Sequence, residues 1–230
     1  MSIFDKIYKY NLWVFGSGSG SIPINNKPYI NFLNNFLINY NIKSIIDIGC
    51  GDWQISKNIN WNNTKYLGID IVKDVIDKNL KKYSSENINF ICEDILKSNN
   101  LPDAECYILK DVLQHLPNEK IFKILKILSS KNYKFIIIVS DTSVINFNMI
   151  DIFEGSYRPV DISKKPYNIQ YILKKSYIEK FYLIIYFLIF LYILYLFIRK
   201  TDKFSYFLIV FIIIGFMIPR KNIYVIKKNK

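Results

Sequence analysis

Short apolar runs alternate with segments of helical spacing along residues 27–139, and few folds accommodate that order. Apolar runs typical of strands occupy residues 44–48, 65–70, 88–92, 105–109 and 135–139. Apolar residues recur every three or four positions, as in helices, over residues 27–40, 71–83 and 117–128. Strands that are apolar throughout and separated by helices are typical of a parallel sheet covered on both faces. We therefore predict an α/β domain with a doubly wound, mostly parallel sheet over residues 27–175.

A glycine-containing turn follows the first predicted strand, in the sequence IIDIGCGDWQIS. Asp47 lies in the strand, Gly49, Cys50 and Gly51 form the turn, and a helix is predicted to begin after it. Glycine allows the backbone to approach a ligand closely, and the first N–H groups of a helix favour a negative group. A G-x-G turn alone is common, so its meaning depends on the residues that end the following strands.

Charged and polar residues close the next three predicted strands, at the edge where open parallel sheets bind ligands. Asp70 ends the second strand, where a carboxylate can accept both ribose hydroxyls of an adenosine. Asp94 follows the third strand, where a carboxylate can accept a hydrogen bond from an adenine amino group. Lys110 and Asp111 follow the fourth, with His115 in the turn beyond. The single histidine and the three cysteines lack the spacing of metal ligands, so we predict no metal site.

Four of these segments, taken in order, resemble the motifs of class I S-adenosylmethionine-dependent methyltransferases. DIGCGD resembles the first motif of that family, YLGID its second-strand acid, INFICED its third motif and ILKDVLQHLP its fourth-strand segment. The resemblance covers roughly residues 42–140. The resemblance is to small bacterial and viral members of the family. The segments GSGSGS at 16–21 and GSYRPVDI at 155–162 also resemble these members. It implies a Rossmann-like fold with an antiparallel last strand, and S-adenosylmethionine as the cofactor.

The resemblance also implies roles for residues at this edge of the sheet. It implies that Asp47 and the turn lie near the methionine part of the cofactor, Asp70 on the ribose, Asp94 on the adenine, and the Lys110 backbone near the amino group. The predicted cofactor-binding residues are Asp47, Gly49, Cys50, Gly51, Asp70, Ile71, Asp94, Ile95 and Lys110.

Two residues are candidates for catalysis. His115 is a candidate general base, because a neutral imidazole suits removal of a proton from an acceptor hydroxyl. Asp111 is the second candidate, either as the base or as the residue that orients the base. Methyl transfer from a sulfonium depends mostly on positioning, so catalysis does not require a base.

Two apolar runs without charged residues follow the predicted domain. Residues 181–198 form an 18-residue run and residues 204–219 a 16-residue run, separated by RKTDK. A membrane span needs about 20 apolar residues. We therefore predict two transmembrane helices, 177–198 and 204–219, as a C-terminal apolar helical hairpin. The alternative is a pair of buried core helices.

The formal net charge is +12, and the basic excess lies in the last third of the chain, beside the apolar runs. That arrangement fits an anionic membrane surface better than a nucleic-acid groove. We therefore predict a membrane as partner and nucleic acid as an unlikely one. If the runs form a hairpin, more basic residues flank the domain side than the connecting loop, which predicts that the domain lies on the cytosolic side.

The two ends of the chain leave more than one interpretation open. Residues 1–26 are an N-terminal segment whose Gly/Ser run is typical of a flexible linker by composition. Residues 167–173 alternate as a sixth strand would, and NIYVIK at 222–227 as an antiparallel seventh. Residues 220–230 are then either the last strand of the sheet or a basic tail. If these residues are the last strand, the apolar runs are an insertion that leaves the sheet at the edge where ligands bind. The active site would then face the bilayer.

The predicted function is a membrane-attached methyltransferase. Its methyl acceptor is not identified by the sequence; the predicted geometry points to one that is lipidic or held in a membrane. One alternative is a non-catalytic, membrane-anchored module that binds a nucleotide cofactor. A nicotinamide-dependent oxidoreductase is less favoured, because the turn lacks G-x-G-x-x-G and no Tyr-x-x-x-Lys pair is evident.

Overall fold

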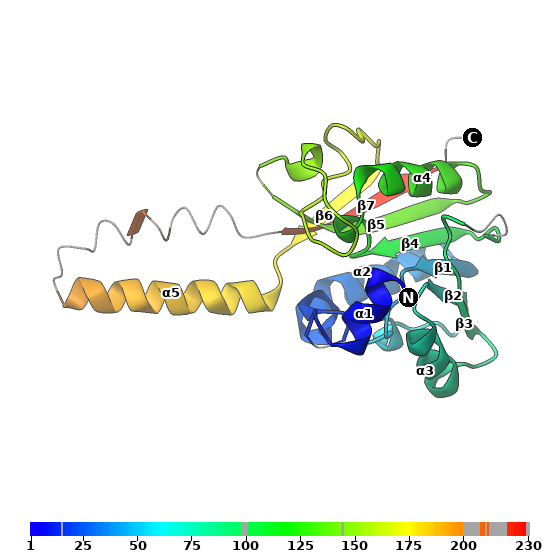
Figure 1. Cartoon of the computed structure of the whole chain (residues 1–230), viewed down its shortest axis with the longest axis horizontal. Coiled ribbons are helices and arrows are strands. Elements are labelled where there is room, and N and C mark those ends of the chain that lie inside the picture. The colour runs from blue at the N-terminus through cyan, green and yellow to red at the C-terminus, as the bar shows by residue number, and fades with distance from the viewer. Residues whose placement is uncertain are drawn as a thin grey trace.

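A seven-stranded sheet forms the centre of the protein (Figure 1). The computed structural model describes residues 1–14, 16–97, 101–143, 145–199, 208, 209, 211 and 220–228. The strands are β1 (Ser44–Ile48), β2 (Lys65–Asp70), β3 (Ile88–Cys92), β4 (Cys106–Lys110), β5 (Phe135–Thr142), β6 (Leu173–Tyr177) and β7 (Arg220–Lys227). Their order across the sheet is β3-β2-β1-β4-β5-β7-β6.

Strand directions confirm the doubly wound, mostly parallel sheet with an antiparallel last strand. β1 to β5 pair in parallel, while β7 pairs antiparallel with β5 on one side and β6 on the other. β6 therefore runs parallel to β1–β5. This is a Rossmann-like sheet, and the alternative that residues 220–230 are a loose tail is wrong, because β7 lies inside the sheet.

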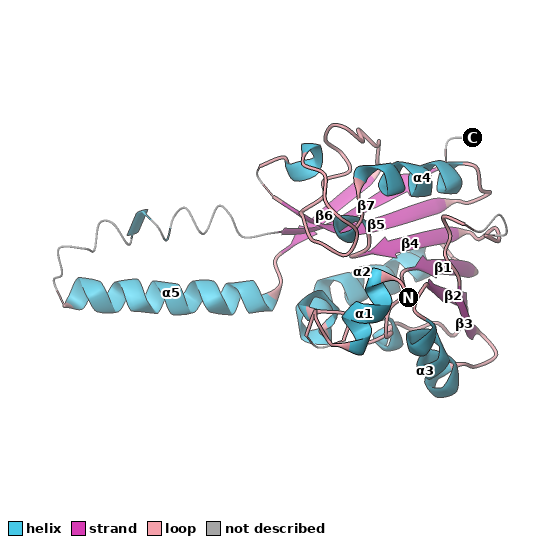
Figure 2. Ribbon diagram, in the orientation of Figure 1, coloured by secondary structure: helices cyan, strands magenta, loops and turns pink. Residues whose placement is uncertain are grey.

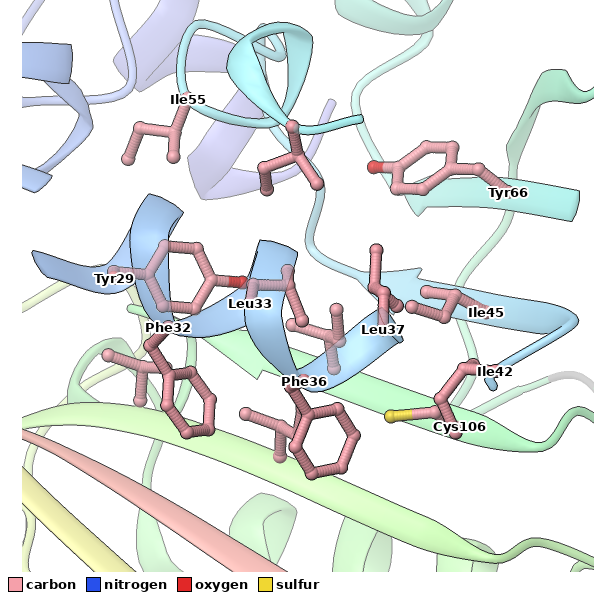
Figure 3. Packing of buried hydrophobic residues seen from close by; sticks show 14 of the residues in the cluster. Tyr29, Phe32, Leu33, Phe36, Leu37, Ile42, Ile45, Ile55, Tyr66 and Cys106 are labelled. Carbon is pink, nitrogen blue, oxygen red and sulfur yellow. The ribbon is translucent and has the colours of Figure 1, made fainter. Parts of the chain in front are cut away.

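Helices cover both faces of the sheet (Figure 2). The helices of the described chain are α1 (Ile3–Lys9), α2 (Lys27–Asn39), α3 (Lys73–Tyr83), α4 (Asn118–Ser129) and α5 (Lys180–Ile198), and α5 does not take part in this cover. Successive strand residues point to opposite faces, so Ile45 packs in the cluster with α2, and Ile46 in the cluster with α4. Figure 3 shows the first cluster, where Leu33, Phe36 and Leu37 of α2 lie over the strands.

The prediction of a helix directly after the Gly49–Gly51 turn is wrong. Only a three-residue 3-10 helix, Ser56–Asn58, lies between β1 and β2. This connection is rich in asparagine, whose side chain competes for backbone groups. The side chain of Asn58 donates to the Gln54 carbonyl at 2.9 Å, and the Asn62 amide donates to the Asn60 side chain at 3.1 Å. Local turns therefore replace a regular helix here.

The sixth strand is also displaced from its predicted position at 167–173. β6 begins only at Leu173, because Tyr167 is buried beside α4 and is held away from the sheet edge. The Tyr167 hydroxyl donates to the side chain of Asn118 and accepts from Arg158 at 3.2 Å. The chain reaches the sheet only when the Ile172 amide donates to the Val225 carbonyl at 2.8 Å.

The first apolar run forms α5, which projects away from the sheet (Figure 1). The predicted pair of transmembrane helices is not confirmed. In the part of the chain that the structure describes, no helix combines the length and the apolar character needed to cross a membrane. The 19 residues of α5 give about 28 Å at a rise of about 1.5 Å per residue, against an apolar bilayer core of about 30 Å. Most of the second run, 204–219, lies outside the described residues.

α5 is not a core helix either. Leu183, Ile184, Phe187, Leu188 and Tyr192 are among the large side chains that it exposes. The segment that contains it joins β6 to β7, and Tyr177 of β6 pairs with Lys221 of β7. We call residues 180–219 the apolar extension. Because β6 runs parallel to β1–β5, the extension leaves the sheet at the carboxyl ends of these strands.

Candidate active site

A cavity of ≈ 160 Å³ lies at the carboxyl ends of β1, β2 and β4. All eleven site residues predicted from the sequence line it: Asp47, Gly49, Cys50, Gly51, Asp70, Ile71, Asp94, Ile95, Lys110, Asp111 and His115. Five residues from the N-terminal segment also line it: Phe4, Tyr8, Trp13, Ser17 and Ser21. The predicted residues therefore share one hollow, while their individual roles stay predictions.

The turn after β1 requires glycine at two positions. Gly49 has φ +73° and Gly51 φ +55°, a region that side-chain-bearing residues rarely adopt. A Cβ on Gly49 would come within 2.5 Å of a Val112 methyl, and one on Gly51 within 2.6 Å of the Ser17 hydroxyl. The turn therefore carries no side chains at these two positions where its backbone lines the cavity, which would allow a ligand to approach the backbone closely.

Asp70 anchors the glycine turn and presents a carboxylate to the cavity. One oxygen accepts from the Gly51 amide and the other from the Val72 amide, each at 3.0 Å. Burial raises the pKa of Asp70, and these backbone hydrogen bonds oppose the rise. Each carboxylate oxygen can accept a further hydrogen bond, so Asp70 retains the capacity to bind a pair of hydroxyls.

Asp47 is more deeply enclosed, at the end of β1. Its carboxylate accepts from the Tyr66 hydroxyl at 2.7 Å and from Ser56 at 3.3 Å. Burial raises the pKa of Asp47 to about 6, against these two hydrogen bonds. The Asp47 carboxylate is therefore oriented by protein groups, and it carries its negative charge mainly above pH 6.

The Asp94 carboxylate and apolar side chains also line the cavity. One oxygen of Asp94 accepts from the Leu96 amide at 3.0 Å, and the other lies 3.3 Å from the Lys97 ammonium. Ile71 and Ile95 line the same region. Apolar walls with one acceptor suit a flat heteroaromatic ring that carries an amino group. Burial raises the pKa of the Cys50 thiol, so Cys50 lines the cavity as a neutral group.

The Gly/Ser run folds over the glycine turn, so its interpretation as a flexible linker is wrong. The Ser17 hydroxyl donates to the Asp52 side chain at 2.8 Å and accepts from the Asp52 amide at 3.1 Å. Ser17 also lies 2.5 Å from the Tyr8 hydroxyl. The Lys110 ammonium donates to the Gly20 carbonyl at 3.1 Å. We call residues 3–21 the N-terminal strap. The hydrogen bonds of the Gly/Ser run distinguish it from a flexible linker, and its composition does not predict them.

His115 also lines the cavity. Its Nδ1 lies 2.9 Å from the Ser156 carbonyl oxygen. A carbonyl only accepts, so Nδ1 carries the hydrogen and Nε2 keeps its lone pair. Trp13 of the strap lies against the ring, with ring centroids 4.4 Å apart. Burial lowers the pKa of His115, which keeps the imidazole neutral near pH 7, as a general base requires.

Asp111 is a poorer base. Burial alone would raise its pKa, but the ammonium groups of Lys110 and Lys221 lower the pKa of Asp111 to about 2. Both lysines bond its carboxylate. Such a weak base seldom takes a proton near neutral pH. Its predicted role in orienting the base is not supported either, because the orienting hydrogen bond of His115 goes to Ser156.

The sequence reasoning missed a buried group of charged residues beside the cavity. Lys221 is 2% exposed, and its ammonium lies 3.0 Å from Asp141 and 3.4 Å from Glu179, in addition to its bond with Asp111. Burial alone would lower the pKa of Lys221, but these carboxylates raise it well above its usual value. In the sequence Lys221 is one of several basic residues around the segment NIYVIK, and nothing in that pattern marks it as buried.

Comparison with known proteins agrees with this geometry. Residues 46–129 match the family described as "Methyltransferase domain". The N-methyltransferase NodS from Bradyrhizobium japonicum WM9, solved with S-adenosyl-l-homocysteine, is 8% identical with a TM-score of 0.59, over 91% of this chain and 89% of NodS. Magnesium protoporphyrin IX methyltransferase (ChlM) from Synechocystis PCC 6803, solved with bound SAH, is 18% identical with a TM-score of 0.50, over 62% of this chain and 72% of ChlM.

Other comparisons are more limited. The chain spans 27% of the length of PKMT2 from Rickettsia typhi, solved with AdoHcy, at 19% identity over 56% of this chain and a TM-score of 0.42. No curated protein matches the chain in sequence. At these identities the likeness to solved structures extends to the fold. The matched domain on this fold supports an S-adenosylmethionine-dependent methyltransferase as the enzyme class, and S-adenosylmethionine as the cofactor.

Proposed function

We propose that the cavity binds S-adenosylmethionine and that His115 removes a proton from a hydroxyl of the methyl acceptor. The observation that carries this proposal is that carboxylates at the carboxyl ends of β1, β2 and β3 line the same cavity as a neutral histidine whose Nε2 keeps its lone pair. A matched methyltransferase domain over residues 46–129 supports it independently.

In this proposal the chain's own residues bind, orient and accept a proton. Asp70 accepts the ribose hydroxyls, Asp94 accepts the adenine amino group, and the bare backbone at Gly49 and Gly51 lies along the methionine part. The bound cofactor supplies an electrophilic methyl group. His115 Nε2 would accept the proton that the acceptor hydroxyl loses when its oxygen takes the methyl group and the sulfonium leaves as a neutral thioether. The N-terminal strap would exclude water. Alignment of the two reactants supplies most of the acceleration.

Replacing Asp70 with Ala should weaken cofactor binding by about 1.5–3 kcal/mol, or about 10- to 150-fold, the range for hydrogen bonds to a charged group. Calorimetric titration of the full chain with S-adenosylmethionine measures the change. Asp77→Ala is the matched control, because Asp77 forms an exposed ion pair with Lys73 outside the cavity. Equal affinity in both variants would exclude the ribose role of Asp70. Titration with a nicotinamide dinucleotide in parallel tests the oxidoreductase alternative.

We further propose that the apolar extension attaches the protein to a membrane, with the domain on the cytosolic side and an acceptor that is lipidic or membrane-held. The support is the exposure of large apolar side chains along α5 and the departure of the extension from the edge that carries the cavity. Basic residues lie at and just before its start, at Lys174, Lys175 and Lys180, where they suit anionic headgroups. Lys221 does not count among these basic residues, because it is buried.

Removal of the extension should abolish membrane binding while sparing cofactor binding. A variant in which Asn-Gly replaces residues 180–219 keeps β6 and β7 paired, since this dipeptide favours tight hairpin turns. The full chain should float with vesicles that contain anionic lipid, and the variant should stay in solution with unchanged affinity for S-adenosylmethionine. Equal flotation of both would exclude the extension as the anchor. Transfer of a labelled methyl group to lipid or membrane-protein fractions then tests the acceptor.

A further inference from the structure

Buried charges link β7 to the segments that hold His115. The ammonium of Lys221 lies 3.0 Å from one oxygen of Asp141, at the end of β5. The other oxygen of Asp141 accepts from the Gln114 amide at 3.3 Å and from the Tyr157 hydroxyl at 3.1 Å. Gln114 also accepts from the Asp141 backbone amide at 3.2 Å. One carboxylate therefore joins a lysine to two polar side chains.

These two side chains flank the hydrogen bond that orients the histidine. Gln114 directly precedes His115, and Tyr157 directly follows Ser156, whose carbonyl accepts from His115 Nδ1. Backbone hydrogen bonds also connect the two segments. The Gly155 amide donates to the His115 carbonyl at 2.9 Å, and the Arg158 amide donates to the Gln114 carbonyl at 3.0 Å. A displacement of Asp141 would therefore move both partners of the His115–Ser156 hydrogen bond.

We propose that Lys221 is a positioning residue for His115, acting through Asp141, Gln114 and Tyr157. The inference rests on the proposed function, in which His115 is the base. A buried carboxylate without a countercharge is unstable, so Asp141 keeps its place between the two segments only while Lys221 faces it. Lys221 also contacts Asp111 in the turn before His115, and Glu179 next to the start of the apolar extension.

The single histidine of the chain makes the test direct, because every imidazole signal in a nuclear magnetic resonance spectrum comes from His115. In the native protein the ¹⁵N shifts should report one tautomer, with the hydrogen on Nδ1. Lys221→Met should give a mixture of tautomers and lower kcat by about 10- to 100-fold, the scale of a misplaced catalytic group. The KM for S-adenosylmethionine should change far less. Lys221→Arg should restore part of the single-tautomer signal.

Lys227→Met is the matched control, because Lys227 lies exposed at the other end of the same strand. If Lys221→Met does not fold, Tyr157→Phe decides, since it removes only the hydroxyl bonded to Asp141 from a side chain that is 48% exposed. An unchanged tautomer signal in folded Lys221→Met, or otherwise in Tyr157→Phe, overturns the proposal. A changed signal with unchanged kcat supports positioning by Lys221 and contradicts His115 as the base, so the two failures are distinguishable.

Discussion

Replacing His115 with Ala should lower turnover by about 10²- to 10⁴-fold, the usual contribution of a general base. The affinity for S-adenosylmethionine should stay nearly unchanged, because the carboxylates expected to bind it, Asp70 and Asp94, lie on other strand ends. Single-turnover transfer of a labelled methyl group and calorimetric titration measure the two quantities separately. A loss of binding equal to the loss of turnover would make His115 a cofactor or structural residue instead.

A second substitution distinguishes the role of His115 as a base from its role as a hydrogen-bond donor to Ser156. The amide nitrogen of Asn can replace Nδ1 as donor to the Ser156 carbonyl, but it supplies no base. His115→Asn should therefore be as slow as His115→Ala, and recovery of turnover in the Asn variant would contradict the base role.

The pH profile offers a further check on the same residue. Burial lowers the pKa of His115 below its ordinary value and Lys221 adds to this, against the hydrogen bond with Ser156 and the charges of Asp111 and Asp141. The active, neutral form should therefore persist at pH values where an ordinary histidine is half protonated.

Deleting residues 222–230 should abolish cooperative unfolding of the domain. β7 lies between β5 and β6, and Ile223, Tyr224 and Val225 are fully buried. Burial of each such side chain contributes about 1.5–3 kcal/mol, and a domain of this kind is stable by only about 5–15 kcal/mol. The deletion also leaves the buried backbone groups of β5 without partners. Circular dichroism during thermal unfolding is the measurement.

Truncation after Lys228 is the control, because it removes only residues 229 and 230 and keeps every paired residue of β7. It should unfold at the temperature of the full chain. A cooperative transition that survives the larger deletion would mean that β7 contributes little to the stability of the sheet.

The strands and the edge of the sheet could be predicted because local rules determine them. The runs ending at Ile48, Asp70 and Cys92 are mostly apolar, and a buried parallel strand requires that property whatever surrounds it. The glycine turn and the acids after it were predictable for a related reason. Parallel strands bring their carboxyl ends to one edge, so residues distant in sequence line one cavity.

Other parts of the site depend on contacts that no local pattern encodes. The Gly/Ser run is ordered by the bonds of Ser17 with Tyr8 and Asp52, and its composition gives no sign of either. Lys221 appears in the sequence as one more basic residue of a basic segment, yet three carboxylates from separate elements surround it. The displaced β6 has a similar cause, since Tyr167 bonds with Asn118 and Arg158 instead of entering the sheet.

The pairing of Tyr177 with Lys221 has a consequence for how such a chain could evolve. The two residues face each other on neighbouring antiparallel strands, so a tight turn could join them without moving either strand. Chain added at a hairpin end costs little conformational entropy, because the closure cost rises only slowly with length. One insertion or deletion in the gene could therefore add or remove the whole extension in a single step. We expect homologues of this protein either to contain the whole extension or to lack it, while β6 and β7 are retained.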